Sequence, residues 1–143
     1  MKVRITLQNG ALAPVYQTDG SAGADVFACL DSPVDILPGE RVIISTGLNV
    51  ELSPGWELQV RPRSGLALKN GITLVNAPGT IDSDYRGELK AILINHGKEP
   101  FRVENKMRIC QIVLARAERA DFEVVESLNG STRGSGGFGH TGI

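Results

Sequence analysis

Short apolar segments alternate with polar positions along most of the chain. Side chains two residues apart share one face of an extended strand, so alternation with a period of two is typical of half-buried β-strands. The alternating positions are Val3, Ile5 and Leu7; Val42 and Ile44; Leu48, Val50 and Leu52; Trp56, Leu58 and Val60; and Leu89, Ala91 and Leu93. Runs rich in Val, Ile and Leu predict further strands near residues 24–30, 72–75, 100–104, 107–115 and 121–125.

Turn dipeptides separate these segments. They are Asn9-Gly10, Pro38-Gly39, Pro54-Gly55, Asn70-Gly71 and Pro78-Gly79. Helical periodicity is nearly absent, and the best candidate is a short turn from Ser64 to Lys69 with Ser64 as its N-cap. Many short strands at regular spacing predict an all-β fold, either a barrel or a sandwich.

The amino-acid composition narrows the possible classes of protein and of binding partner. The chain has 143 residues, of which 41% are hydrophobic and 22% charged, the size and mixture of one globular domain. The formal net charge is -1, so stable binding of nucleic acid is not expected and any bound anion has to be held locally. No apolar run predicts a membrane span or a signal peptide. Cys29 and Cys110 lie in apolar runs, which favours two reduced thiols and a cytoplasmic location.

The last part of the chain differs from the rest. Residues 127–143 have the sequence SLNGSTRGSGGFGHTGI, and so much glycine does not hold one conformation unaided. A disordered terminus is one interpretation. Arg133 and Phe138 favour another, because a cation and a lone aromatic ring among glycines are typical of a flap that closes over an anionic, planar ligand. We therefore expect a β-domain over residues 1–126 and a flexible flap over residues 127–143.

Three segments of the β-domain carry candidate chemistry. Asp25 stands at the head of a strand, where a carboxylate either caps a turn, holds a metal-bound water or orients a basic group. In residues 61–67, Arg63 and the start of the short helical turn form either a plain surface turn or a cradle for an anion. Residues 76–87 are longer than a usual hairpin loop and carry two carboxylates, a tyrosine and an arginine. An acidic, solvated turn is the alternative for this loop.

Five ordered segments have long, specific sequences: AGAD (22–25), PRSGLA (62–67), GTIDSDYRGE (79–88), NKMRICQ (105–111) and RGSGGFGHTG (133–142). Together they closely resemble the trimeric dUTPase family, the deoxyuridine triphosphate nucleotidohydrolases. The resemblance implies a single-domain, jelly-roll-like β-barrel and a homotrimer with shared active sites. It also implies hydrolysis of dUTP to dUMP and pyrophosphate, with Mg²⁺ on the triphosphate. Such an enzyme keeps uracil out of DNA and supplies dUMP for dTMP synthesis.

The resemblance implies roles for individual residues at the base, the sugar and the attacked phosphate. Asp82 orients and deprotonates the water that attacks the α-phosphate, because water at neutral pH is a poor nucleophile. Tyr85 packs on the deoxyribose and excludes a ribose. The residues implied to bind the uracil are Asn76, through its amide, and Thr80, Ile81 and Lys90. Asp84, two residues after Asp82, receives no catalytic role.

The resemblance also assigns the phosphate side and the flap. The phosphate-binding residues of the β-domain are implied to be Arg63, Ser64, Gly65 and Gln111. Asp25 is implied to contact Mg²⁺ through water only. The flap residues implied to complete the site are Arg133, Phe138, Gly139 and Thr141. Among these, Phe138 stacks on uracil, Arg133 acts as a second catalytic residue at the phosphates, and the whole flap comes from a neighbouring subunit.

Two other functions stay open. A dCTP deaminase has the same fold and needs a proton-shuttling glutamate at the base, and Glu88 follows the candidate catalytic loop here. A non-catalytic nucleotide-binding protein that adopted this fold is the second alternative. Loss of Asp82 or Arg133 would be its signature, and both residues are present.

Overall fold

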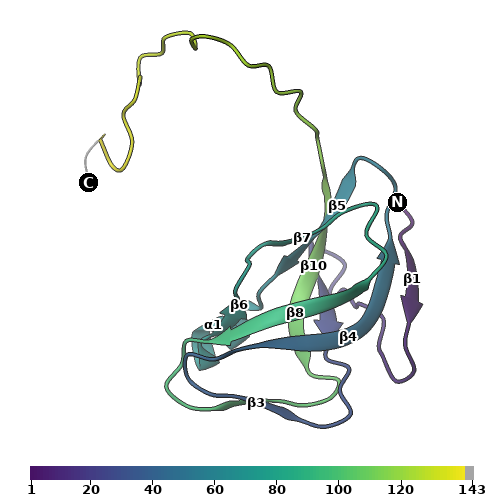
Figure 1. The fold of residues 1–143 in the computed structure, drawn as a ribbon. Helices are drawn as coiled ribbons and strands as arrows, with labels where there is room; N and C mark the ends of the chain where they lie inside the picture. Colours follow the sequence, from purple (N-terminus) through teal and green to yellow (C-terminus); the bar gives the residue numbers. More distant parts are fainter. Residues whose placement is uncertain (141–143) are drawn as a thin grey trace.

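A computed structural model describes residues 1–140 of the chain. This part forms two four-stranded sheets, one two-stranded sheet and one short helix (Figure 1). The first sheet has the order β1 (Arg4–Leu7), β4 (Arg41–Glu51), β8 (Glu88–Asn95) and β6 (Ile72–Leu74). The second has the order β2 (Ala24–Phe27), β10 (Arg108–Arg116), β5 (Trp56–Arg61) and β7 (Gly79–Ile81). The small sheet pairs β3 (Val34–Ile36) with β9 (Phe101–Val103).

All neighbouring strands run antiparallel, and their inward side chains form a single core. The alternation expected for half-buried strands is clear in β8, where Leu89, Ala91 and Leu93 are buried and the residues between them are not. The largest fully buried apolar side chains are Ile36, Ile44, Leu48, Ile72, Leu89, Leu93, Ile109, Val26 and Val103. They come from all three sheets, so one core holds the domain together.

The structure confirms most of the predicted strands and corrects several details. Residues 41–51 form one long strand rather than two, because a β-bulge between Ser45 and Leu48 carries the strand through the break in alternation. The sequence pattern did not predict β3 and β7, which are only three residues long and follow or precede turn residues. Within residues 1–140 the sheets remain separate hydrogen-bonded units, in a jelly-roll-like arrangement without one continuous closed ladder.

The predicted strand at residues 121–125 is wrong for the single chain. The segment has apolar alternation, but no other strand of the described chain pairs with it, and Phe122 and Val124 are 90% and 97% exposed. A strand needs a hydrogen-bonded neighbour to be stable in water. Beyond β10, the chain runs away from the sheets as an extended arm (Figure 1).

The predicted helical turn is present as α1 (Ser64–Asn70). Its N-cap is Arg63, with extended backbone angles, rather than Ser64, which is the first helical residue. No side chain caps this end of the helix, so the backbone N–H groups of its first turn lack a side-chain partner. Across residues 1–140, the structure has no helix with the length and apolar composition needed to cross a bilayer.

Candidate active site

A cavity of about 440 Å³ opens beside Asp82. It lies where the end of β7, the bend that follows it, β8 and β4 meet. Its lining residues are Ile43, Thr80, Ile81, Asp82, Tyr85, Glu88, Lys90 and Ile92. We call this site the Asp82 cavity. It brings together five of the residues predicted from the sequence to contact the substrate, namely Thr80, Ile81, Asp82, Tyr85 and Lys90.

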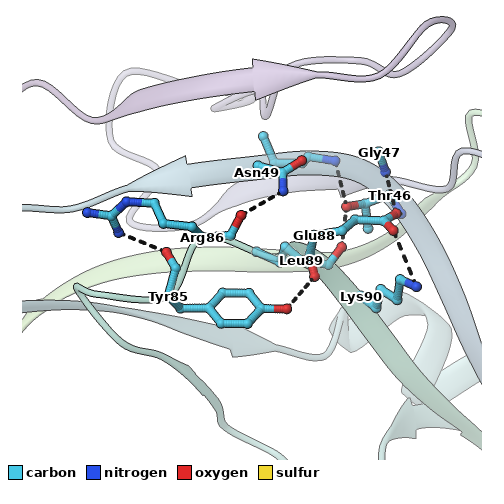
Figure 2. A network of polar contacts seen from close by, with 9 residues as sticks. Thr46, Gly47, Asn49, Tyr85, Arg86, Glu88, Leu89 and Lys90 are labelled. Atoms are coloured by element: carbon cyan, nitrogen blue, oxygen red, sulfur yellow. Dashed lines mark hydrogen bonds and ion pairs between the residues drawn. The ribbon is translucent and has the colours of Figure 1, made fainter.

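Backbone and side-chain hydrogen bonds shape the bend after β7. The Tyr85 N–H donates to the Asp82 carbonyl at 3.2 Å, and the Tyr85 hydroxyl donates to the Glu88 carbonyl at 2.9 Å (Figure 2). The Arg86 guanidinium donates to the carbonyls of Ser83 and Tyr85 at 2.7 and 2.9 Å. These bonds close the bend on itself and leave the Asp82 side chain exposed at the cavity. Asp84 does not line the Asp82 cavity, but lines a neighbouring cavity to which Asp82 also contributes.

One edge of β8 also presents backbone N–H and C=O groups, on the side of the strand that faces away from β4. The carbonyl of Ile92 accepts a hydrogen bond from the N–H of Val75 at 2.9 Å, so Ile92 directs its backbone groups away from β4. Alternate residues of an antiparallel strand direct both backbone groups to the same side. Lys90 therefore also turns its N–H and C=O away from β4, toward the open edge of the strand. A donor and an acceptor on one residue are what the edge of a pyrimidine base requires.

Asn76 lies close to the start of β7. A Cβ atom placed on Gly79 would come within 3.1 Å of Asn76 Nδ2, so glycine at this position lets the amide approach the strand. Asn76 itself is exposed and is not among the lining residues of the Asp82 cavity. The structure thus places this amide beside β7 without bringing it to the other candidate base-binding residues.

A second group of charged residues surrounds Asp25 on β2. Asp25 is only 7% exposed, and its two carboxylate oxygens accept from two different arginines: Oδ1 from Arg63 Nε at 3.0 Å and Oδ2 from Arg108 Nη1 at 3.1 Å. Arg63 also donates to the carbonyl of Arg108 at 3.2 Å. We call these three residues the Asp25 cluster. A buried carboxylate requires cationic or hydrogen-bonding partners, and the two arginines supply them.

Sequence reasoning missed Arg108. It lies in the segment 105–111 that carried the resemblance, and the burial of a carboxylate at the head of β2 already demanded a cationic partner. Gln111 belongs to the same region, since it stands opposite Asp25 in the β10–β2 ladder and donates from Nε2 to the Pro62 carbonyl at 3.1 Å. Ser64 and Gly65, the first two residues of α1, are exposed directly beside Arg63.

The donor groups of the chain fit a Mg²⁺ ion only when a phosphate brings most of the ligands. Residues 1–140 contain no group of three or more His, Cys, Asp or Glu side chains that could hold a metal. Asp25 keeps unused lone pairs on both oxygens, so it can accept from a water of a hydrated ion beside its arginines. Mg²⁺ commonly keeps several waters and binds through substrate phosphates, and this donor set agrees with that behaviour.

The flap residues do not reach either group within one chain. Arg133 donates from Nε to the Gly136 carbonyl at 2.8 Å, and Phe138 is fully exposed. Gly139 lies in the same extended arm, which Figure 1 shows well separated from the sheets. The arm is held by local turns, such as the bond from His140 N–H to the Gly137 carbonyl at 3.1 Å. Thr141, the remaining predicted flap residue, lies outside the described residues.

The Asp82 cavity and the Asp25 cluster occupy opposite ends of β5. Ile81 pairs with Leu58, so Asp82 follows at the level of Glu57, whereas Arg63 lies six positions farther along the chain (63 − 57). At about 3.3 Å per residue the two sites are roughly 20 Å apart along an extended chain. A triphosphate is only three linked tetrahedra long, which is much shorter than this separation.

Comparisons with known proteins identify the family. The chain belongs to the dUTPase family, because the family model described as dUTPase matches residues 10–142. The deoxyuridine 5'-triphosphate nucleotidohydrolase of Chlamydia pneumoniae is 57% identical over 143 residues, which is 99% of this chain and 99% of that protein. That of Treponema denticola is also 57% identical, over 100% of this chain and 99% of that protein.

Solved structures show the same fold. The dUTPase of Staphylococcus bacteriophage 80alpha with dUpNHpp has a TM-score of 0.88 at 23% identity, over 99% of each chain. A mutant dUTPase of phage phi11 of S. aureus, which coordinates a structural Mg(II) ion, has a TM-score of 0.81 at 18% identity, over 91% of this chain and 100% of that one. At these identities the likeness concerns the fold, and it confirms the expected all-β, jelly-roll-like architecture.

Proposed function

We propose that this chain is an enzyme that hydrolyses dUTP to dUMP and pyrophosphate. The observation that carries the proposal is the Asp82 cavity, where an exposed carboxylate lies beside a tyrosine ring and the free backbone edge of β8. Membership of the dUTPase family and the two 57% identical nucleotidohydrolases support the same activity. The product dUMP serves dTMP synthesis, and removal of dUTP keeps uracil out of DNA.

Asp82 is the proposed general base. Its carboxylate is exposed at the end of β7, so it can hold a water molecule in line with the α-phosphate and accept its proton as the phosphorus–oxygen bond forms. Pyrophosphate is then the leaving group. A positioned base of this kind contributes typically 10²–10⁴-fold to a rate. The backbone bond from Tyr85 to Asp82 holds the bend in the conformation that presents the carboxylate.

Tyr85 and the β8 edge are the proposed specificity elements. The Tyr85 hydroxyl is fixed on the Glu88 carbonyl, so its ring forms a rigid wall against which a deoxyribose packs and a 2′-hydroxyl collides. The N–H and C=O of Lys90 face outward, and with Thr80, Ile81 and the amide of Asn76 they match the acceptor O4 and donor N3–H of uracil. Cytosine reverses this pattern, which leaves polar groups unpaired and is strongly disfavoured.

The Asp25 cluster is the proposed phosphate side of the site. Arg63, the first turn of α1 at Ser64 and Gly65, and Gln111 offer guanidinium, hydroxyl, backbone N–H and amide donors. Asp25 holds Arg63 and Arg108 side by side in spite of their like charge. A Mg²⁺ ion bound to the triphosphate supplies neutralisation of phosphate charge, and Asp25 contacts it only through water.

The distance along β5 supports a site shared between subunits of a homotrimer. The path along the chain from the level of Asp82 to Arg63 is roughly 20 Å when extended, so the phosphate-binding residues proposed for each Asp82 come from another copy. The arm after β10 supports the same assembly. It exposes the apolar side chains of Phe122 and Val124, while β1 is an edge strand with all four residues exposed.

The flap is the third proposed contribution, and it also comes from a neighbouring chain. Arg133 offsets phosphate charge, Phe138 stacks on the uracil ring, and Gly139 and Thr141 bind the γ-phosphate. The extended arm supports this role because it carries Arg133 and Phe138 away from their own sheets. The glycines allow the flap to open for exchange of substrate and product.

Two unpaired cysteines support a reducing compartment such as the cytoplasm.

Glu88 does not support the alternative of cytosine deamination. Its carboxylate accepts hydrogen bonds from two backbone N–H groups and pairs with Lys90 at 3.4 Å. Although burial raises its pKa, the bonds from Gly47, Lys90 and Thr46 outweigh this effect and lower the pKa below its ordinary value. A carboxylate held in its charged form is a poor proton donor, which is the role that deamination requires.

A pyrophosphate-release assay with dUTP, UTP, dTTP and dCTP, with and without Mg²⁺, tests the proposal. We expect rapid release from dUTP with Mg²⁺ and little from the other nucleotides. The Asp82→Asn variant should still bind dUTP but turn over about 10³-fold more slowly. Asp84→Asn is the matched control, since Asp84 is an exposed carboxylate of the same bend that does not line the Asp82 cavity, and it should retain activity. Ammonia released from dCTP, or unchanged turnover in Asp82→Asn, contradicts the proposal.

A further inference from the structure

The β-bulge in β4 lies directly behind the Asp82 cavity. Ser45 pairs with Lys90 and Leu48 pairs with Leu89, so Thr46 and Gly47 are extra residues with no partner of their own on β8. Gly47 has a φ of 65°, a conformation that glycine adopts readily and other residues rarely. The regular ladder bonds are therefore missing just where the edge of β8 enters the cavity.

Side chains replace the missing ladder bonds. Glu88 Oε1 accepts from the N–H groups of Thr46 at 3.1 Å and of Gly47 at 2.9 Å (Figure 2). The Thr46 hydroxyl donates to the Leu89 carbonyl. The other carboxylate oxygen of Glu88, Oε2, pairs with Lys90 Nζ at 3.4 Å. One side chain that is only 14% exposed thus joins the bulge, β8 and the lysine of the cavity.

The same residue also holds the tyrosine. The backbone carbonyl of Glu88 accepts from the Tyr85 hydroxyl at 2.9 Å, and the carbonyl of Arg86, two residues earlier, accepts from Asn49 Nδ2 at 3.0 Å (Figure 2). Any movement of Glu88 relative to β4 therefore moves the anchor of the Tyr85 ring. It also moves the backbone edge at Lys90, two residues along the strand.

We propose that Glu88 is a positioning residue for sugar discrimination, which acts by fastening the start of β8 to the bulge of β4. This inference rests on the proposed function. Glu88 does not contact the reacting atoms, and it acts through Tyr85 and the edge at Lys90. When its carboxylate is replaced by an amide, the N–H groups of Thr46 and Gly47 keep only a weaker, uncharged acceptor at Oε1, and Lys90 loses its ion pair. The wall against the 2′-hydroxyl then loosens.

The discriminating measurement is the ratio of kcat/KM for dUTP to kcat/KM for UTP. A purely structural role of Glu88 lowers the amount of active enzyme and leaves this ratio unchanged, because both nucleotides are tested on the same molecules. A misplacement of about 1 Å costs on the order of 10²-fold. For a loosened but intact cavity we expect Glu88→Gln to lower the ratio about tenfold, because UTP is excluded less strongly while dUTP is positioned less well.

Glu51→Gln is the matched control. Glu51 lies on the same strand as the bulge and forms an exposed pair with Arg4 at 3.5 Å, and it does not line the Asp82 cavity. We expect its ratio to equal that of the wild type. Where Glu88→Gln does not fold, Lys90→Met decides, because it removes only the ion pair of the network and is expected to lower the ratio by a smaller factor.

An unchanged ratio in folded Glu88→Gln overturns the inference. So does an unchanged ratio in Lys90→Met where the first variant does not fold. A wild-type enzyme without dUTP hydrolysis refutes the proposed function and the inference with it. An active wild type with an unaffected variant ratio refutes only the inference, so the two failures are distinguishable.

Discussion

The carboxylate of the Asp82 cavity and that of the Asp25 cluster have opposite environments. Asp82 is exposed at the end of a three-residue strand and borders an open cavity of about 440 Å³. Asp25 is buried, and both of its oxygens are already bonded to arginines. The first carboxylate is free to accept a proton from a reacting molecule. The second is committed to orienting two cations.

On the proposed function, this difference corresponds to two separate roles toward a nucleotide. Charges that only hold a phosphate benefit from being fixed before the substrate arrives, because no reorganisation is then needed during the reaction. A general base has to remain accessible to water and substrate. The two sites lie at opposite ends of β5, and in the proposed shared site their roles meet when more than one copy of the chain assembles.

Deletion of residues 131–143 tests whether the Asp82 cavity and the Asp25 cluster are enough for dUTP hydrolysis without the flap. We expect the loss of Arg133 and Phe138 to lower dUTP turnover by at least about 10²-fold, because a flap positions the substrate and excludes water. Residues 131–140 form hydrogen bonds only among themselves, so melting temperature and oligomeric state should stay the same. An active truncated enzyme would show that the tail is a disordered terminus without a role in the reaction.

Mixing two inactive variants tests whether the two sites serve one substrate from different chains. Asp82→Asn and Arg63→Ala are each expected to be nearly inactive. When the two are unfolded together and refolded as a 1:1 mixture, about a quarter of shared sites would combine an intact Asp82 with an intact Arg63. Recovery of about that share of wild-type activity is expected. The two variants refolded separately and then combined are the control, and no recovery in the refolded mixture argues for sites within single chains.

Asp25→Asn tests the stability of the cluster. The substitution leaves Arg63 and Arg108 close together without their shared anion, and breaking a largely buried pair costs about 3 kcal/mol. For a chain of this size that lowers the melting temperature by about 10 °C. Asp35→Asn is the matched control, since Asp35 pairs with Arg102 at 3.1 Å on the surface and should cost less than about 1 kcal/mol. Equal losses would remove the distinction between the two carboxylates.

Glu88 lines the Asp82 cavity, yet its carboxylate is paired as that of Asp25 is. Measuring stability against pH tests whether this paired charge stabilises the folded state. The pKa of Glu88 is lowered from its ordinary value of 4.5, so its charge stabilises the folded state above that value. This stabilisation is lost as pH falls from about 4.5 through the lower pKa of the folded state. Wild type should therefore melt a few degrees above Glu88→Gln at pH 7, and the gap should shrink toward pH 3. A gap independent of pH would contradict a role for the charge.

The apolar alternation of the sequence was enough to predict most strands, since a strand with one buried face carries its pattern in consecutive residues. Long motifs such as residues 79–88 likewise pointed to the candidate site, because a resemblance depends only on the order of residues. The pattern failed at residues 121–125. There the alternation is present, but the single chain offers no partner strand, and the sequence does not say which chain provides one.

The sequence by itself determined the all-β class, the short helix at residues 64–70 and the segments that carry charge. Only the tertiary structure decided which of those charges meet. Asp25, Arg63 and Arg108 are separated by 38 and 83 positions along the chain, and Glu88 reaches the bulge of β4 across 41 and 42. Such contacts depend on strand order and register, which arise when the whole core is packed and are not encoded in any local segment.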